Sequence, residues 1–140
     1  MVESEEWIRC CLQKSGAYID HPFGPDSTII KVEGRIFAQL FTLKGQKSMT
    51  LNCEMMAGQF YRSLYPGVIV RGYHCPPVQR PYCNTFPLDG TVPDDLIHEM
   101  IDHSYAAVVK KLPKYLKRSL AVCNLRGALR KCNLNFVLYN

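Results

Sequence analysis

Residues 28–43 read TIIKVEGRIFAQLFTL, and this stretch decides the fold class. Its first five residues are mostly apolar and β-branched, which favours a strand. Glu33-Gly34 follows and fits a two-residue turn, because glycine accepts a positive φ. Residues 35–43 then place apolar side chains on both faces of a second strand. The stretch predicts an antiparallel hairpin, and the sequence KGQK at residues 44–47 predicts a second turn.

A third strand over residues 48–53 leads into a helix that begins at Asn52 or Cys53 and ends near Tyr65. Pro66-Gly67 stops this helix. An apolar side chain recurs at every fourth position of the helix and should face the core. These side chains are Met56, Phe60 and Leu64.

A further helix is signalled between Thr91 and Pro113. Thr91 is expected to cap it, and Asp94 and Asp95 suit its positive end. Pro113 ends or kinks it. Its core face should consist of Ile97, Ile101, Tyr105, Val108 and Leu112. A last helix from residue 114 onward would be lined by Leu116, Leu120, Leu125 and Leu129.

The remaining elements complete the order α, β-β-β, α, β-β, α. Residues 4–15 predict a helix that Ser4 caps. Residues 68–73 and 83–88 predict short strands, and the prolines of residues 75–81 make that stretch a loop or hairpin tip. Antiparallel hairpins with helices on one side predict an α+β fold.

The charge of the chain is uneven along its length. Its 140 residues suit a single domain. Residues 1–102 hold 9 Lys/Arg and 12 Asp/Glu, whereas residues 103–140 hold 8 Lys/Arg and no acid. A basic segment of this kind indicates an anionic partner, and a solvated helix face is the alternative.

Composition also indicates the compartment. No apolar run reaches the roughly 18 residues of a membrane helix. The first residues, MVESEE, are acidic and unlike a secretory signal. Seven cysteines without Cys-x-x-Cys spacing indicate free thiols in a reducing compartment. We therefore expect a cytoplasmic protein that is not membrane-bound.

Catalytic motifs are missing from the sequence. It has no Gly-rich phosphate loop and no Gly-x-Ser-x-Gly elbow. Asp102-His103-Ser104 contains triad residue types, but helical neighbours point about 100° apart. We therefore predict a protein that is not an enzyme and carries no cofactor.

A metal or small-ligand site is one hypothesis that the sequence raises. His74, Cys75 and Cys83 could supply three ligands, but no fourth is evident, so no metal is predicted. A cleft near His21, Tyr73 and His74 is the alternative place for a small ligand.

Basic and aromatic residues gather at the hairpin tips and near the end of the last well-signalled helix. This mixture is used on nucleic-acid surfaces, where cations contact phosphates and flat rings contact bases. The candidate nucleic-acid-binding residues are Lys44, Lys47, Arg71, Tyr73, His74, Arg80, Tyr82, Lys110, Lys111 and Lys114.

Four blocks of sequence together resemble a known family. They are HPFGPD at 21–26, YPG at 65–67 with GYH at 72–74, NT at 84–85 with LDGTVPD at 88–94, and SY at 104–105 with KKLPK at 110–114. In this order and spacing, over about residues 4–115, the chain resembles the MmcQ/YjbR family of small bacterial proteins.

This resemblance implies a curved antiparallel sheet with helices packed on it, as in the double-wing and frataxin-like (CyaY-like) proteins. It implies a family domain over residues 1–115, with residues 116–140 as a basic helical C-terminal extension. It also implies DNA binding, through the hairpin wings. Family members typically carry a His-Trp pair where this chain has Tyr82 and Cys83.

Two functions follow from these features. The first is DNA binding by the hairpin wings and the basic C-terminal segment. The alternative is a non-enzymatic protein-interaction or regulatory module. In that case the extension, which ends in Phe136-Val137-Leu138-Tyr139-Asn140, would contact a second copy or another protein.

Overall fold

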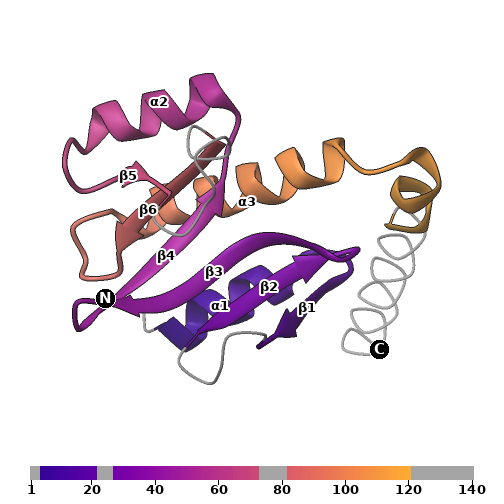
Figure 1. Cartoon of the computed structure of the whole chain (residues 1–140), viewed down its shortest axis with the longest axis horizontal. Helices are drawn as coiled ribbons and strands as arrows, with labels where there is room; N and C mark the ends of the chain where they lie inside the picture. The colour runs from indigo at the N-terminus through magenta and orange to yellow at the C-terminus, as the bar shows by residue number, and fades with distance from the viewer. Residues whose placement is uncertain (1–3, 22–26, 73–81, 121–140) are drawn as a thin grey trace, which may run out of the picture.

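The computed structural model describes residues 4–21, 27–72 and 82–120, and it is an α+β fold (Figure 1). The helices are α1 (Ser4–Leu12), α2 (Met55–Leu64) and α3 (Asp94–Lys110). The strands are β1 (Ala17–Asp20), β2 (Thr28–Val32), β3 (Arg35–Leu43), β4 (Gln46–Asn52), β5 (Val70–Arg71) and β6 (Cys83–Pro87). They form one curved antiparallel sheet in the order β1-β2-β3-β4-β6-β5. The predicted fold class is confirmed.

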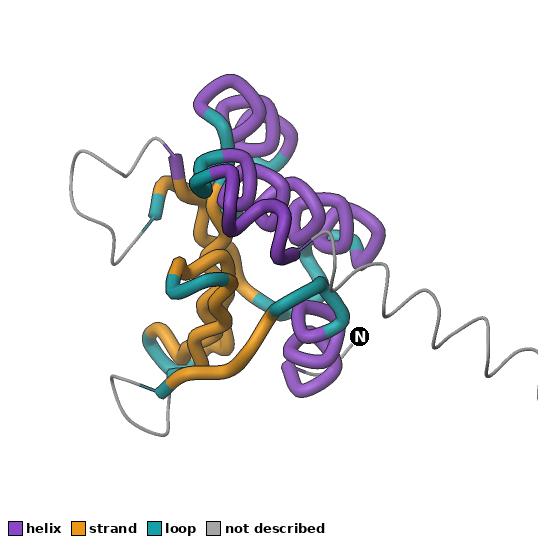
Figure 2. The backbone as a smooth tube through the Cα atoms, turned by 90° about the vertical axis from the view of Figure 1, so that its right-hand side faces the viewer, coloured by secondary structure: helices purple, strands orange, loops and turns teal. Residues whose placement is uncertain are grey.

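The helices lie on one side of the sheet, as Figure 2 shows. α3 packs across β3 and β4, α1 packs on β1, β2 and β3, and α2 contacts β6. The space between these helices and the sheet is filled by large side chains with almost no exposure, among them Trp7, Phe37, Phe86 and Ile101. The sequence order therefore produces two layers with one core between them.

The first hairpin turn forms where the sequence predicts it, and the second is shorter than predicted because Gln46 and Lys47 already belong to β4. Glu33 and Gly34 have φ of 50° and 77°, and Lys44 and Gly45 have φ of 50° and 79°. Two successive residues with positive φ are characteristic of a type I′ turn, whose twist matches that of the flanking strands. The turns set the register, in which Val32 pairs with Arg35.

α3 buries the face that its periodicity predicts. Ile97, Ile101, Val108 and Leu112 are buried, and Tyr105 packs against the core from a half-buried position. The predicted cap is wrong, because Pro93 occupies the N-cap position. Its backbone is extended, and no side chain makes a capping hydrogen bond there. The Thr91 amide instead donates to Oδ1 of Asp89 at 3.0 Å.

The prediction for α2 is wrong about which face is buried. Met56, Phe60 and Leu64 are 79%, 58% and 47% exposed. Two apolar stripes run side by side along this helix, and periodicity alone cannot choose between them. The buried stripe is the one with Tyr61, whose neighbour Gly58 accepts a hydrogen bond from the Asn84 amide at 3.3 Å.

Two strands also differ from the predictions. β1 was not predicted, because it is a short edge strand whose Tyr18 and Ile19 are exposed and show no alternating pattern. Within the described part of the strand expected over residues 68–73, only Val70–Arg71 form a strand, β5, which pairs with β6. The loop or hairpin tip expected at residues 75–81 lies outside the described residues.

The chain continues past Pro113 into a helical stretch over residues 114–120. Leu116 and Leu120 pack against the core, and the Ser15 hydroxyl donates to the Leu120 carbonyl at 3.3 Å. Leu125 and Leu129 lie outside the described part of the chain. A domain boundary at residue 115 stays a prediction.

The buried Ser104 hydroxyl joins α3 to the sheet, so its loss should be costly. It donates a hydrogen bond to the Phe37 carbonyl and accepts one from the backbone amide of Asn52 at 2.9 Å. We expect Ser104→Ala to lower the free energy of unfolding by about 1–3 kcal/mol, because two buried backbone groups lose their partner. Urea denaturation measures this change.

The control for Ser104→Ala is Ser63→Ala. The Ser63 hydroxyl also bonds a backbone carbonyl, that of Phe60 at 2.6 Å, but on the exposed side of α2. That variant should stay within about 0.5 kcal/mol of the unaltered protein. Equal effects of the two substitutions would contradict the role given to Ser104.

Candidate nucleic-acid interface

A cleft of about 420 Å³ lies where the end of α3 passes over the ends of β3, β4 and β6. It forms because β3 and β4 separate there. Their pairing ends at Ala38 and Leu51, so the first residues of β3 are left to pair with β2 alone. The lining residues are Gly34, Arg35, Ile36, Gln39, Asn52, Cys53, Tyr82, Cys83, Ala107, Val108 and Lys111.

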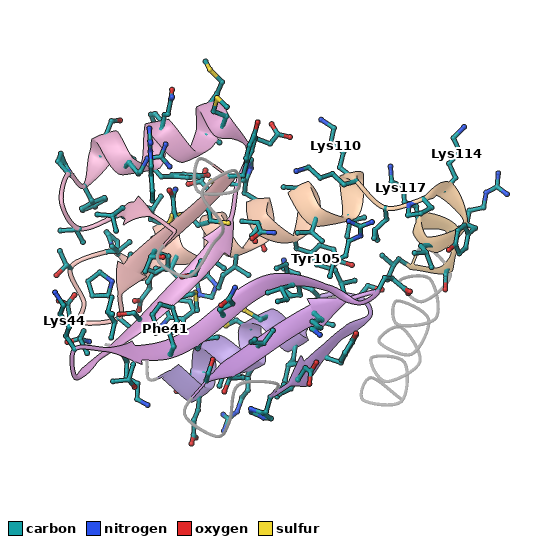
Figure 3. All side chains as sticks on the ribbon, viewed as in Figure 1. Phe41, Lys44, Tyr105, Lys110, Lys114 and Lys117 are labelled. Carbon is teal, nitrogen blue, oxygen red and sulfur yellow. The ribbon has the colours of Figure 1, made fainter. Side chains whose placement is uncertain are left out.

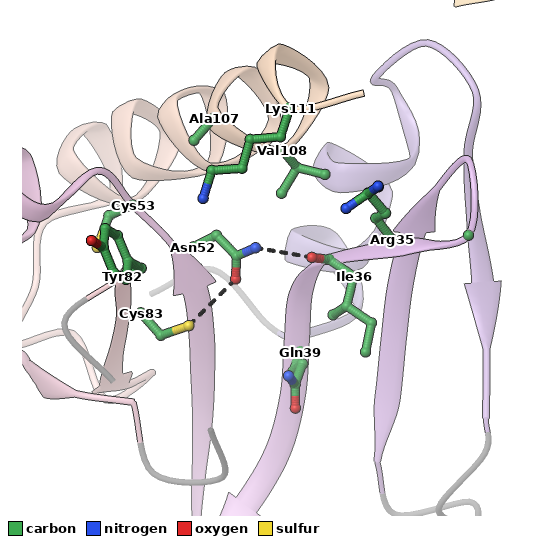
Figure 4. A pocket seen from close by; sticks show the side chains of 11 residues that line it. Arg35, Ile36, Gln39, Asn52, Cys53, Tyr82, Cys83, Ala107, Val108 and Lys111 are labelled. Carbon is green, nitrogen blue, oxygen red and sulfur yellow. Dashed lines mark hydrogen bonds between the residues drawn. The ribbon is translucent and has the colours of Figure 1, made fainter. Parts of the chain in front are cut away.

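Two cations enter this cleft from different sides, as Figure 4 shows. Arg35 is the first residue of β3, and Lys111 is the C-cap residue of α3. None of the eleven lining residues is acidic. Such a cleft carries positive potential and favours an anionic ligand.

An aromatic ring lies beside one of these cations. The Lys111 ammonium is 5.2 Å from the centre of the Tyr82 ring, which is cation–π distance. Tyr82 remains 38% exposed. The cleft therefore offers a flat apolar surface as well as charge.

The side-chain amide of Asn52 spans the gap between the separated strands. Its Nδ2 donates a hydrogen bond to the Ile36 carbonyl at 3.1 Å. Its Oδ1 accepts a hydrogen bond from the Cys83 thiol, with Sγ and Oδ1 3.6 Å apart. Figure 4 shows these two hydrogen bonds, through which the side-chain amide connects β3 to β6 across the cleft.

Several predicted residues lie at this end of the sheet without lining the cleft. Lys110 and Lys114 are exposed at the end of α3 and just beyond it, and Lys110 is 3.5 Å from Glu54. Arg71 is exposed at the end of β5, where it pairs with Asn84 next to Cys83.

The structure separates Lys44 and Lys47 from the other candidates. They flank the β3–β4 turn, at the far end of β3 from Arg35. A nine-residue strand spans about 26 Å from its first to its last Cα atom at roughly 3.3 Å per residue. Figure 3 shows Lys44 and Lys110 at opposite sides of the molecule. Tyr73, His74 and Arg80 lie outside the described residues.

Sequence reasoning missed Arg35, Gln39 and Asn52. Arg35 was read only as the start of a strand, although it directly follows the Glu33-Gly34 turn and so lies at the sheet end. Gln39 and Asn52 gave no signal, because their role depends on where the β3–β4 ladder stops.

The proposed ligand cleft near His21 cannot be assembled from the described residues, since Tyr73 and His74 are not among them. His21 itself is exposed, with Nδ1 3.1 Å from the Ser27 carbonyl. Among residues 4–21, 27–72 and 82–120, no three His, Cys, Asp or Glu side chains gather as a metal site would require. Burial raises the pKa of the Cys11 thiol to about 12, so this thiol stays protonated.

Comparison with known proteins supports the fold and identifies the family. The chain belongs to the YjbR family, whose model matches residues 12–107. It is 27% identical over 117 residues to an Escherichia coli (strain K12) protein named "Uncharacterized protein YjbR", covering 84% of this chain and 95% of that one.

Solved structures share the same fold. The crystal structure of Deinococcus radiodurans protein DR2400, with a DUF419 domain, is similar at a TM-score of 0.76 and 25% identity, covering 86% of this chain and 89% of that one. A Pseudomonas syringae crystal structure is similar at a TM-score of 0.62 and 18% identity, covering 74% of this chain and 96% of that one, which shows the fold alone. None of the helices in the described ranges is long and apolar enough to cross a membrane.

Replacing the Asn52 side chain should open the cleft beside Cys83. Asn52→Ala removes the side-chain oxygen that accepts a hydrogen bond from the Cys83 thiol. The buried Cys83 sulfur should then become more accessible. We expect iodoacetamide to label Cys83 faster, as measured by mass spectrometry of the Cys83 peptide. Gln46→Ala, at the other end of β4, should leave the rate unchanged. An unchanged rate in Asn52→Ala would contradict the bridging role.

Proposed function

We propose that this protein binds nucleic acid through the end of the sheet that carries the cleft. We call this surface the basic end, and it consists of Arg35, Arg71, Tyr82, Lys110, Lys111 and Lys114. One observation carries the proposal: Arg35 and Lys111 converge on a cleft that has no acidic side chain among the eleven described residues that line it.

The cations of the basic end are largely available to a ligand. In the described ranges, ion pairs use Lys14, Lys31 and Lys110, and none of them uses Arg35 or Lys111. Lys114 and Arg71 are likewise absent from these pairs and are exposed. Cations that are not used in ion pairs can contact the phosphates of a nucleic acid. Each such contact favours binding, because it releases counterions condensed on the nucleic acid.

The proposal is for binding rather than catalysis. The cleft supplies cations, amides and a ring, which are recognition groups. The Cys83 thiol donates to Asn52 and does not act as a nucleophile in this proposal. The proposal also revises the double-wing expectation, because it assigns binding to the basic end and not to the β3–β4 turn.

Salt dependence tests this proposal. Fluorescence anisotropy of labelled DNA should show affinity that falls steeply with salt. The double variant Arg35→Gln, Lys111→Gln should reduce the slope of log K against log salt by about one, since the two side chains converge on one cleft and each phosphate contact contributes about 0.7–0.9.

The matched control removes the same charge from the opposite end of β3. The double variant Lys44→Gln, Lys47→Gln should leave the slope nearly unchanged. An equal loss in the control would place the contacts elsewhere, and absence of binding at low salt would refute the proposal.

The exposed stripe on α2 supports a second candidate function, contact with another protein. Met56, Phe60 and Leu64 form one uncharged face along the helix. Such a stripe can pack against its own copy about a two-fold axis. This is the interaction-module alternative, with α2 in place of the C-terminal extension as the contact.

Light scattering during size-exclusion chromatography tests that second candidate. We expect the unaltered protein to show a mass above 16.0 kDa, and the double variant Met56→Lys, Phe60→Lys to return to 16.0 kDa. Ser63→Lys, on the same helix outside the stripe, is the control. A protein that is already monomeric at high concentration would exclude this contact.

A further inference from the structure

The cleft combines four recognition groups in a small space. Arg35 and Lys111 enter it from two sides, the Tyr82 ring forms part of its wall, and the half-buried Gln39 adds an amide. Its volume of about 420 Å³ lies within the range of about 300–1,000 Å³ that is typical of sites for small ligands. These are the dimensions of a pocket for one molecular unit, whereas an extended groove would follow a whole duplex.

We propose that the cleft receives a single unpaired nucleotide, with its phosphate between Arg35 and Lys111 and its base against Tyr82. This inference rests on the proposed nucleic-acid binding and adds the form of the ligand. Arginine and lysine on two sides of one site suit a phosphate, because guanidinium and ammonium groups both donate to its oxygens. The exposed part of the tyrosine ring suits a base, because every base has a flat π-face.

Base pairing decides which nucleic acid fits this pocket. A duplex keeps the flat faces of its bases stacked on one another, so its phosphates can contact the cations but no base face can reach Tyr82. A single strand has unstacked bases that can turn outward and contact aromatic side chains. We therefore expect this protein to bind a single strand more tightly than a duplex of the same sequence.

Two contacts place Tyr82 at the cleft. The Tyr82 carbonyl accepts a hydrogen bond from the Cys53 amide at 2.8 Å, which ties it to the end of β4. Lys111 lies over the ring on the side of α3. The backbone of Tyr82 is therefore held at the cleft before the ligand arrives, which lowers the entropy cost of binding.

The test compares three ligands on the full chain at one moderate salt concentration. They are a short labelled single strand, the duplex of the same sequence, and a free mononucleotide used as a competitor. The variants are Tyr82→Leu, Tyr82→Phe and, as matched control, Tyr115→Leu, which changes a 69% exposed tyrosine beyond α3 that does not line the cleft.

We expect Tyr82→Leu to weaken single-strand binding by about tenfold, as loss of one base–aromatic stack does. Duplex binding should be unchanged, and Tyr82→Phe and Tyr115→Leu should behave as the unaltered protein. The mononucleotide should displace the single strand from the unaltered protein, a measurement that needs no variant and so stands even if Tyr82→Leu fails to fold.

The outcomes separate this inference from the proposed function. Equal affinity for single strand and duplex, with no effect of Tyr82→Leu, would overturn the inference and leave the phosphate-binding surface intact. Binding of the mononucleotide alone, dependent on Tyr82, would support the pocket and overturn polymer binding. Absence of binding by all three ligands would overturn both.

Discussion

The buried hydroxyl of Ser104 is the contact on which the cleft depends. It joins α3 to the Phe37 carbonyl of β3 and to the backbone amide of Asn52 in β4, at the place where these two strands separate. Without a polar group there, two backbone groups would be buried with no partner at the point where the ladder stops. Lys111 follows Ser104 by about two helical turns, so both lie on the same face of α3. The contact that anchors the helix therefore also directs a cation into the gap.

The origin of the positive charge at this end differs between residues. Lysines at the C-terminal end of a helix are stabilised by the helix dipole, which accounts for Lys110 and Lys111 without any ligand. Arg35 has no such explanation, because it lies at the start of a strand and takes no part in the ion pairs of the described ranges. Its convergence with Lys111, from a point far away in the sequence, is the stronger indication of a site for an anion.

The sequence predicts those parts of this fold that local chemistry determines. The β2–β3 hairpin was predicted with its bounds, because a Glu-Gly pair in a type I′ turn fixes both strand ends. The buried face of α3 was predicted because this helix has one clear apolar stripe. α2 has two stripes, and the choice between them depends on Asn84 in a distant strand. The cleft could not be predicted, because it exists only where the pairing of β3 and β4 ends. The ten candidate residues consequently mixed side chains from opposite ends of the sheet.

The most direct test of this account is backbone amide NMR of the full chain during titration with a single-stranded oligonucleotide. It locates contacts residue by residue and does not depend on any substitution. The account predicts that the shift changes concentrate in residues 34–39, 52–53, 82–83 and 107–111, which surround the cleft. Changes concentrated in residues 43–48, at the β3–β4 turn, would contradict it and favour the hairpin wing. A spectrum that does not respond at low salt would contradict nucleic-acid binding itself.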